Sequence, residues 1–428
     1  MGARQALVLL ALVSLVTPDL GVAQAEQPGP LTVDDLVGLA LSQNPELRAV
    51  RTEVEAAKGR LRQAGFRPNP MLELNGSRNV TATDNSQSIN LSWPLDLGGR
   101  LPARLAVAER ELAVKQVQVE DRERRVAADI RMKAGELFTA QRDLRITDEL
   151  LAANRENQRL VSLRVREGAA PPLDESLLTV EITRLDAQRA IRAGRVETAR
   201  LQLAPLIGAS PAAPLEAIGD LDRLPAVPEL ERALEQALAQ RADLRMAAFE
   251  ERLALARVDK ERAEGRYDAS LMLGYQRQDT GFDLMGMNGA GRFKPIQDVF
   301  HMLMFGVQIT LPVRHQNQGN VAAASAEAEG AARRREAMEL MVRQEVAAAY
   351  AQRAAAVRAA DIYATQVLET ARRNFDVVRQ TYDLGRVSLL EVIAERRRLI
   401  DLEMGYTESL KQRWDAVVEI QRVVGHVR

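Results

Sequence analysis

The sequence contains no cysteine, few aromatic residues and no excess of either charge. The absence of cysteine excludes a disulfide framework, a thiolate metal site, a cysteine nucleophile and lipidation at an N-terminal cysteine. With 58 basic and 59 acidic residues, the chain lacks the basic excess of a nucleic-acid-binding surface, so we expect no nucleic-acid partner. No Ser, His or carboxylate constellation has catalytic spacing, so we expect neither an enzyme nor a cofactor.

The first 25 residues are typical of a secretory signal peptide. Arg4 supplies a positive charge, residues 6–16 form a short apolar core, and Ala23-Gln24-Ala25 is an Ala-x-Ala cleavage site. After residue 25 there is no apolar run of about 18 residues, the length that indicates a membrane-spanning helix. We therefore expect an exported protein that is either soluble or inserted in a membrane through β-structure.

The chain is a tandem duplication. Ala-Leu-Ser-Gln-Asn-Pro-Glu-Leu-Arg at residues 40–48 corresponds to Ala-Leu-Ala-Gln-Arg-Ala-Asp-Leu-Arg at residues 237–245. Later motifs recur in the same order in both copies, which indicates that the chain consists of two structural repeats. We predict a first structural repeat over 26–208, a proline-rich linker over 209–228 and a second repeat over 229–428.

Each repeat reads as helix, β-hairpin, long helix, turn and shorter helix. Apolar residues seven apart, such as Ile130, Leu137, Leu144 and Leu151, indicate helices packed as coiled coils. Alternation of apolar and polar residues indicates strands, most clearly over 302–312. The first helices are expected over 31–66 and 229–266, the strands over 71–80, 87–94, 269–278 and 302–312, the long helices over 101–166 and 320–384, and a Gly/Met-rich loop over 279–301.

The predicted strands indicate how copies of the chain assemble. They are about ten residues long with one polar and one apolar face, the pattern of outer-membrane barrels, which need at least about eight strands. Each chain supplies only four, and open sheet edges are excluded from lipid. The barrel must therefore be shared between two or three chains. Polar inward positions favour a wet lumen and hence three chains; these positions are Ser88, Asn90, Ser92, Gln308 and Thr310.

Three motifs carry a family resemblance. They are Trp93-Pro94-Leu95-Asp96-Leu97-Gly98-Gly99-Arg100, Asn317-Gln318-Gly319-Asn320 and Tyr382-x-x-Gly385-x-x-Ser388-x-Leu390-Glu391-Val392. With the duplication, the chain resembles TolC-like outer membrane efflux factors, and the first two motifs resemble the subgroup that works with heavy-metal (cobalt–zinc–cadmium or copper–silver) resistance-nodulation-division (RND) pumps.

The resemblance implies a fold that is mainly α with a β-barrel portion. Three chains would form a 12-stranded barrel in the outer membrane, continuous with a periplasmic α-helical coiled-coil barrel that holds most of the mass. It also implies a homotrimer in contact with outer-membrane lipid, a periplasmic adaptor (membrane fusion) protein and an inner-membrane RND pump. The expected function is passive efflux of small solutes, in particular heavy-metal cations. A type I protein-secretion channel and a periplasmic coiled-coil scaffold without a pore remain as alternatives.

The two helical turns are expected to be the docking tips. Glycine tolerates the left-handed conformation that ends a helix, so Gly168 and Gly385 should close the two hairpins. The resemblance implies that the tips touch the adaptor; these residues are Gly168, Ala169, Ala170, Gly385, Arg386, Val387 and Ser388. The first tip departs from the family pattern because Pro171-Pro172 stands where Ser or Thr is usual.

Asp174 and Glu391 occupy matching positions in the two repeats. In a trimer each would form a ring of three carboxylates at the tunnel constriction, which would favour cations. Ser388-x-x-Glu391 also fits a helix-capping box, and acids near a helix N-terminus complement its dipole. A cap and a pore ring therefore both remain open for these residues.

The methionines near the second hairpin, including Met285 and Met287, could contact a soft metal such as Cu(I) or Ag(I). They could equally serve as adaptable hydrophobic residues. His301, His315 and His426 show no ligand spacing, so we predict no stable metal site. The triple-arginine runs at 333–335 and 396–398 are expected on solvated helix faces.

Overall fold

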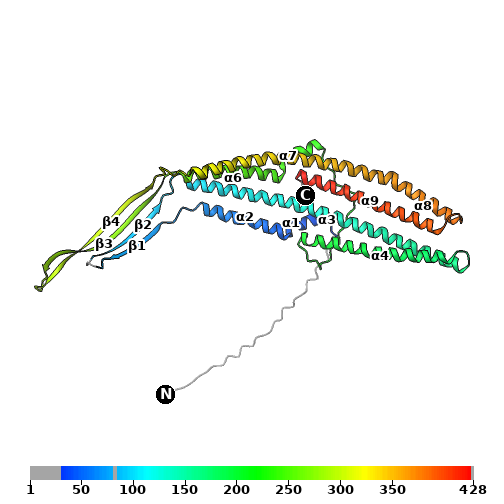
Figure 1. Ribbon diagram of the computed structural model, residues 1–428, viewed down its shortest axis with the longest axis horizontal. Helices are drawn as coiled ribbons and strands as arrows, with labels where there is room; N and C mark the ends of the chain where they lie inside the picture. The colour runs from blue at the N-terminus through cyan, green and yellow to red at the C-terminus, as the bar shows by residue number, and fades with distance from the viewer. Residues whose placement is uncertain (1–29, 81–83, 426–428) are drawn as a thin grey trace, which may run out of the picture.

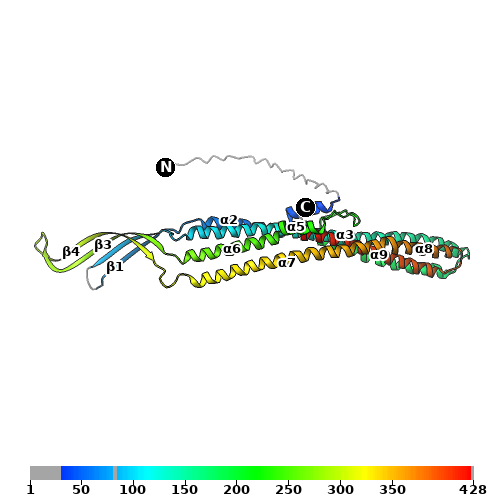
Figure 2. The same ribbon diagram turned by 90° about the horizontal axis from the view of Figure 1, so that it is seen from above.

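The computed structural model describes residues 30–80 and 84–425, without the side chain of Asp283. The predicted signal peptide (1–25) and His426 thus lie outside the described residues. The molecule is a long rod, with a sheet at one end and two helical turns at the other (Figures 1 and 2). No helix in the described part of the chain has a stretch long and apolar enough to cross a membrane.

Both repeats run along this rod in the predicted order (Figure 1). The first consists of α1 (Val33–Gln43), α2 (Pro45–Ala64), β1 (Met71–Arg78), β2 (Asn85–Pro94), α3 (Arg100–Arg166), α4 (Pro172–Leu203) and the 3-10 turn η1 (Ala204–Ile207). The second consists of α5 (Leu230–Gln240), α6 (Ala242–Glu264), β3 (Asp268–Met287), β4 (Phe293–Thr310), α7 (Gln318–Ile362), the π-helical turn η2 (Tyr363–Val367), α8 (Leu368–Asp383) and α9 (Leu389–Val424).

The first helix of each repeat is divided, where one continuous helix was expected. Thr32 and Asp35 form a capping box at the start of α1. Pro45 begins α2, and the Oδ1 atom of Asn44 accepts a hydrogen bond from the backbone N–H of Leu47 at 2.9 Å. Proline disfavours helical geometry in the residue before it, which explains the break. The second repeat breaks at Arg241 without a proline.

The two long helices differ from each other. α3 is continuous over 67 residues, about 100 Å at 1.5 Å per residue. The helix expected over 320–384 is instead interrupted by η2. There the Tyr363 ring lies against α9 at Gly405, where an added Cβ atom would be 2.9 Å from the tyrosine hydroxyl. A glycine thus provides the space for this close contact.

The four strands form one antiparallel sheet in the order β1-β2-β3-β4. The expectation of a loop over 279–301 was wrong, because β3 extends to Met287 and β4 begins at Phe293. Backbone pairing continues from Asp279 opposite Val299 to Met287 opposite Phe293, with one irregularity between Phe282 and Met285. The glycines and methionines obscured the alternation there. The β3–β4 ribbon consequently projects beyond β1 and β2 (Figure 1).

The largest described core cluster joins α1, α3 and α9 at the middle of the rod. Ile130 and Leu137 of the predicted seven-residue pattern are buried there. Phe138 and Trp414 meet edge to face, with ring centroids 5.9 Å apart. Trp414 approaches Gly135 so closely that a Cβ atom there would be 2.6 Å from its ring. This cluster fixes the two long elements relative to each other.

Candidate functional site: a two-faced sheet and two hairpin tips

The sheet has one mostly apolar and one mostly polar face. Exceptions include the row of Gln87, Arg277 and His301 on the apolar face and Phe300 on the polar face. The strands pair in register, so one cross-strand row reads Leu72, Leu91, Leu273 and Phe305, and the next row on the other face reads Glu73, Asn90, Gly274 and Met304. Rows alternate in this way because successive side chains of a strand point to opposite faces. We define the four-stranded part of the sheet as residues 71–78, 85–94, 268–279 and 299–310.

The apolar face of the four-stranded part carries large hydrophobic side chains. It includes Leu72, Leu74, Ile89, Leu91, Trp93, Leu271, Leu273, Tyr275, Val299, Leu303, Phe305, Val307 and Ile309. Leu303 is 77% and Phe305 82% exposed, far more than side chains of a core. Contiguous exposed apolar surface of this kind marks an interaction with a membrane or a partner.

The polar face carries serine, asparagine and glutamine. Ser88, Asn90, Ser92, Gln308 and Thr310, predicted as inward positions, all lie on this face by the register. The edges of the sheet are β1 and β4, whose outer sides have no strand partner among the described residues. A sheet of this kind can continue into another chain on either side.

The two helical hairpins close with the same motif. Gly168 and Gly385 have φ values of +73° and +72°, as predicted for helix-ending glycines. Their N–H groups donate to the carbonyls of Val165 (3.0 Å) and Tyr382 (2.8 Å). The next N–H groups donate to the carbonyls one residue further back, from Ala169 to Arg164 and from Arg386 to Thr381, which completes a Schellman motif in each case. Ala170, Val387 and Ser388 follow directly, and both tips lie at the end opposite the sheet (Figures 1 and 2).

Asp174 and Glu391 lie in the first turns of α4 and α9. The Oε1 atom of Glu391 accepts hydrogen bonds from the N–H (3.2 Å) and hydroxyl (2.9 Å) of Ser388, so the predicted capping box is present. Asp174 approaches the other hairpin: burial raises the pKa of Tyr382, and the negative charge of Asp174 raises it further. Glu391 thus has a capping role, and the pore-ring hypothesis stays a prediction for both acids.

A buried carboxylate joins the two hairpins behind their tips. Glu181 of α4 has a side chain only 4% exposed and accepts a hydrogen bond from the Nε atom of Arg397 of α9 at 3.0 Å. Arg184 binds the same carboxylate. Burial opposes ionisation of Glu181, but the hydrogen bonds from Arg184 and Arg397 outweigh it and lower its pKa.

The arginine run at 396–398 is therefore not uniformly solvated. Arg397 reaches Glu181, and the Arg396 guanidinium lies 5.5 Å from the centre of the Phe375 ring. In the other run, Arg335 is paired with Glu251 at 2.7 Å. The long arginine side chain can extend from an exposed backbone position to such partners.

The methionines and histidines do not converge on one site. Met285 and Met287 lie on the projecting ribbon opposite Pro295 and Phe293, on the side of β4 that continues the apolar face. His301 accepts or donates a hydrogen bond with the Tyr275 hydroxyl at 2.7 Å. His315 lies in the connection to α7. Over residues 30–80 and 84–425, no three His, Cys, Asp or Glu side chains are grouped to hold a metal ion.

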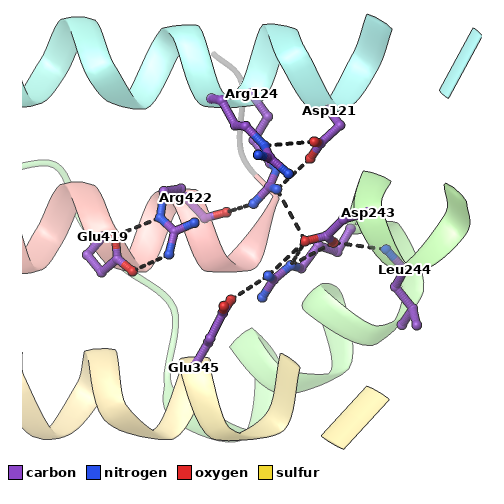
Figure 3. A network of polar contacts seen from close by, with 9 residues as sticks. Asp121, Arg124, Asp243, Leu244, Glu345, Glu419 and Arg422 are labelled. Carbon is purple, nitrogen blue, oxygen red and sulfur yellow. Dashed lines mark hydrogen bonds and ion pairs between the residues drawn. The ribbon is translucent and has the colours of Figure 1, made fainter. Parts of the chain in front are cut away.

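A buried charge network lies where the second repeat's short helices meet the long ones (Figure 3). The side chains of Arg124 on α3 and Arg241 before α6 are each 2% exposed. Asp243 accepts hydrogen bonds from the Nε and Nη2 atoms of Arg241, both at 2.8 Å, and from Nη2 of Arg124 at 3.4 Å. Arg241 also binds Glu345 of α7, and Arg124 donates to the carbonyl of Arg422 of α9 at 2.7 Å.

This network, which we call the charge clasp, was not predicted. Burial would raise the pKa of Asp243, but hydrogen bonds from Arg241 and the charge of Arg124 hold it below its ordinary value. The aligned repeats contained the signal. Arg241 and Asp243 stand where the first repeat has Asn44 and Glu46, so an arginine replaces the neutral cap two residues before an acid in both repeats.

Comparisons with known proteins agree with this geometry. The pattern of the family described as "Outer membrane efflux protein" matches residues 36–209 and 233–426, one segment in each repeat and most of the chain. The cobalt-zinc-cadmium resistance protein CzcC of Cupriavidus metallidurans is 28% identical over 437 residues, covering 96% of this chain and 97% of that protein.

Two solved structures show the same fold. CusC superimposes with a TM-score of 0.73 at 21% identity, covering 92% of each chain. The open state of the MtrE outer membrane channel of Neisseria gonorrhoeae gives a TM-score of 0.71 at 20% identity, covering 92% of this chain and 89% of that one. With two repeats, a two-faced sheet and two matched hairpin tips, the chain belongs to the outer membrane efflux protein family.

Proposed function

We propose that three copies of this chain form a passive conduit that exports heavy-metal cations, delivered by an inner-membrane RND pump through a periplasmic adaptor. Family membership makes the protein an efflux channel component of the outer membrane and not an enzyme. The trimer, the metal cargo and the two partner proteins go beyond family membership and are what we propose.

The proposal rests on one observation, that a sheet with separated faces has two open edges. Four strands are too few to close, and unpaired backbone groups in lipid cost several kcal/mol each. Joining β4 of one copy to β1 of the next would satisfy both edges. Three copies would then give twelve strands, with the apolar face toward lipid and the polar face toward a lumen.

Heavy-metal export is supported by the resemblance to CzcC along nearly the full length of both chains. A conduit passes its cargo without holding it, so it needs no closed metal site. The proposed cargo is tested in the producing cells, by deleting the gene and restoring it from a plasmid. The deletion should reduce tolerance to zinc, cobalt or cadmium, and the plasmid should restore it. Unchanged tolerance to these ions and to copper and silver would contradict the metal assignment but leave the channel itself in place.

We further propose that the hairpin tips dock the adaptor and that Asp174 and Glu391 ring the constriction. The two Schellman turns present identical backbone shapes at one end of the rod, which suits repeated docking around a threefold axis. Single cysteines at Ala169 or Val387 can be labelled selectively, because the chain has no cysteine of its own. A photo-crosslinker attached there should capture the adaptor, while the same label at exposed Val80, at the sheet end, should not.

A further inference from the structure

The methionines of the four-stranded part all lie on one face of the sheet. They are Met71, Met272, Met302 and Met304, and the register places each of them on the polar face. Within the four-stranded part, the apolar face includes leucine, isoleucine, valine, phenylalanine, tryptophan and tyrosine but no methionine. Met285 and Met287 lie further out, on the ribbon side that continues this face. Within the four-stranded part, methionine thus lies on the face opposite the other large apolar residues, with Phe300 as an exception.

This separation is not what a filling role would produce. Within the four-stranded part, methionines that served only as adaptable hydrophobic residues would be expected on the apolar face as well. On the polar face the thioethers instead lie among Ser88, Asn90 and Gln276. Met272, Met302 and Met304 are 39%, 38% and 43% exposed, so their sulfur-bearing side chains are accessible from solvent.

Met304 is a neighbour of both Met272 and Met302, whereas Met272 and Met302 lie two rows apart. Met272 and Met304 are diagonal across β3 and β4, and Met302 and Met304 are adjacent on the same face of β4. Positions related in these ways are about 7–8 Å apart, within reach of long side chains. Glycine lies opposite two of them, Gly306 across from Met272 and Gly274 across from Met304. An added Cβ atom at Gly274 would be 3.2 Å from the Cε atom of Met304, so the thioether lies over this glycine.

We infer that Met272, Met302 and Met304 form a binding site for a soft monovalent cation, Cu(I) or Ag(I). Thioether sulfur is a soft ligand that selects such ions over harder ones such as magnesium or calcium. Two sulfurs on flexible side chains, that of Met304 with that of Met272 or of Met302, can hold an ion that is otherwise hydrated in a wet lumen. The position in the lumen rests on the closed sheet of the proposed function. In that sheet, three copies of the site would form a ring around the lumen. Weak, repeated sites of this kind allow an ion to enter and to leave.

The test uses the full protein extracted in detergent and titrated with silver nitrate in chloride-free buffer. Silver is chosen because it remains monovalent without a reductant. The variant Met272→Leu/Met302→Leu/Met304→Leu keeps the apolar volume and removes the sulfur. The matched control is Met285→Leu/Met287→Leu, which removes two thioethers from the projecting ribbon on the opposite side.

Isothermal titration should show silver binding to the wild type and to the control. The triple leucine variant should bind at least about tenfold more weakly, which corresponds to about 1.4 kcal/mol. Equal affinity of the triple variant and the wild type would overturn the inference, as would an equal loss in the control. If the triple variant does not assemble, the single Met302→Leu and Met304→Leu variants are compared by the same criterion.

The mass of the detergent-extracted protein distinguishes a failure of the silver site from a failure of the proposed conduit. A trimer that binds silver independently of the three methionines would refute the site and leave the conduit intact. A single subunit would contradict the conduit, whatever its silver affinity. Single-channel recordings add a second measurement: micromolar silver should reduce the wild-type current and leave the current of the triple leucine variant unchanged.

Discussion

Removing the negative charge of Asp243 should destabilise the protein far more than removing an exposed carboxylate. In Asp243→Asn, the guanidinium groups of Arg241 and Arg124, each with a 2% exposed side chain, would lose the carboxylate that they share. Breaking a buried ion pair from one side costs about 3–5 kcal/mol, because the remaining charge stays buried. Since Arg241 keeps Glu345 and Arg124 keeps Asp121, we expect about 3 kcal/mol, the lower end of this range.

The matched control is Glu156→Gln, which removes a carboxylate from the exposed pair between Glu156 and Arg159 on α3. Exposed pairs contribute about 0–1 kcal/mol, so this variant should unfold close to the wild type. The assay is thermal unfolding of the detergent-extracted protein, followed by helical circular dichroism at several heating rates. Equal unfolding temperatures of Asp243→Asn and Glu156→Gln would refute the claim that the charge clasp holds α3, α6, α7 and α9 together.

The charge clasp also predicts the direction of the pH dependence. The pKa of Asp243 is lowered in the folded protein, so its contribution to stability is complete above its unfolded pKa, about 3.9. That contribution is lost as the pH falls below this value through the folded pKa. The difference in unfolding temperature between wild type and Asp243→Asn should therefore shrink below about pH 4. A difference that stayed constant into that range would contradict the assignment.

Three further variants test other parts of the account. Glu391→Gln keeps a capping-box residue but removes the charge, so reduced cation preference in planar bilayers would support the pore ring, and unchanged preference would leave Glu391 as a cap only. Gly135→Ala places a Cβ atom 2.6 Å from the Trp414 ring and should cost about 1–3 kcal/mol, seen as a lower unfolding temperature. Glu181→Gln removes the buried charge that holds Arg397, so hydrogen exchange should rise in α4 and α9 behind the tips and stay unchanged in the sheet.

The sequence predicted the elements that depend on local patterns. The seven-residue spacing of Ile130 and Leu137 and the alternation over residues 303–311 are signals within one segment, and the structure has a helix and a strand at these places. The positive φ of Gly168 and Gly385 followed from the need of a helix end for a left-handed residue. Such features need no knowledge of the partner segment.

The features that sequence reasoning missed depend on contacts between distant segments. The π-helical turn at Tyr363 lies where the tyrosine ring approaches Gly405 of α9, a contact between distant segments. The charge clasp depends on Glu345 of α7, which binds Arg241, and on the carbonyl of Arg422 of α9, which accepts a hydrogen bond from Arg124 (Figure 3). The extension of β3 to Met287 depends on pairing with β4, since the segment itself has weak alternation. Tertiary pairing decided each of these, and a single sequence does not display it.

The central claim is that one chain supplies too few strands to close a sheet, so that copies must share their edges. Native mass spectrometry of the protein released from detergent micelles tests this claim most directly. The account predicts a single species with three times the mass of the mature chain, carrying conductance when the same sample is added to planar bilayers. A species with the mass of one chain, still with its full β-sheet signal, would contradict it.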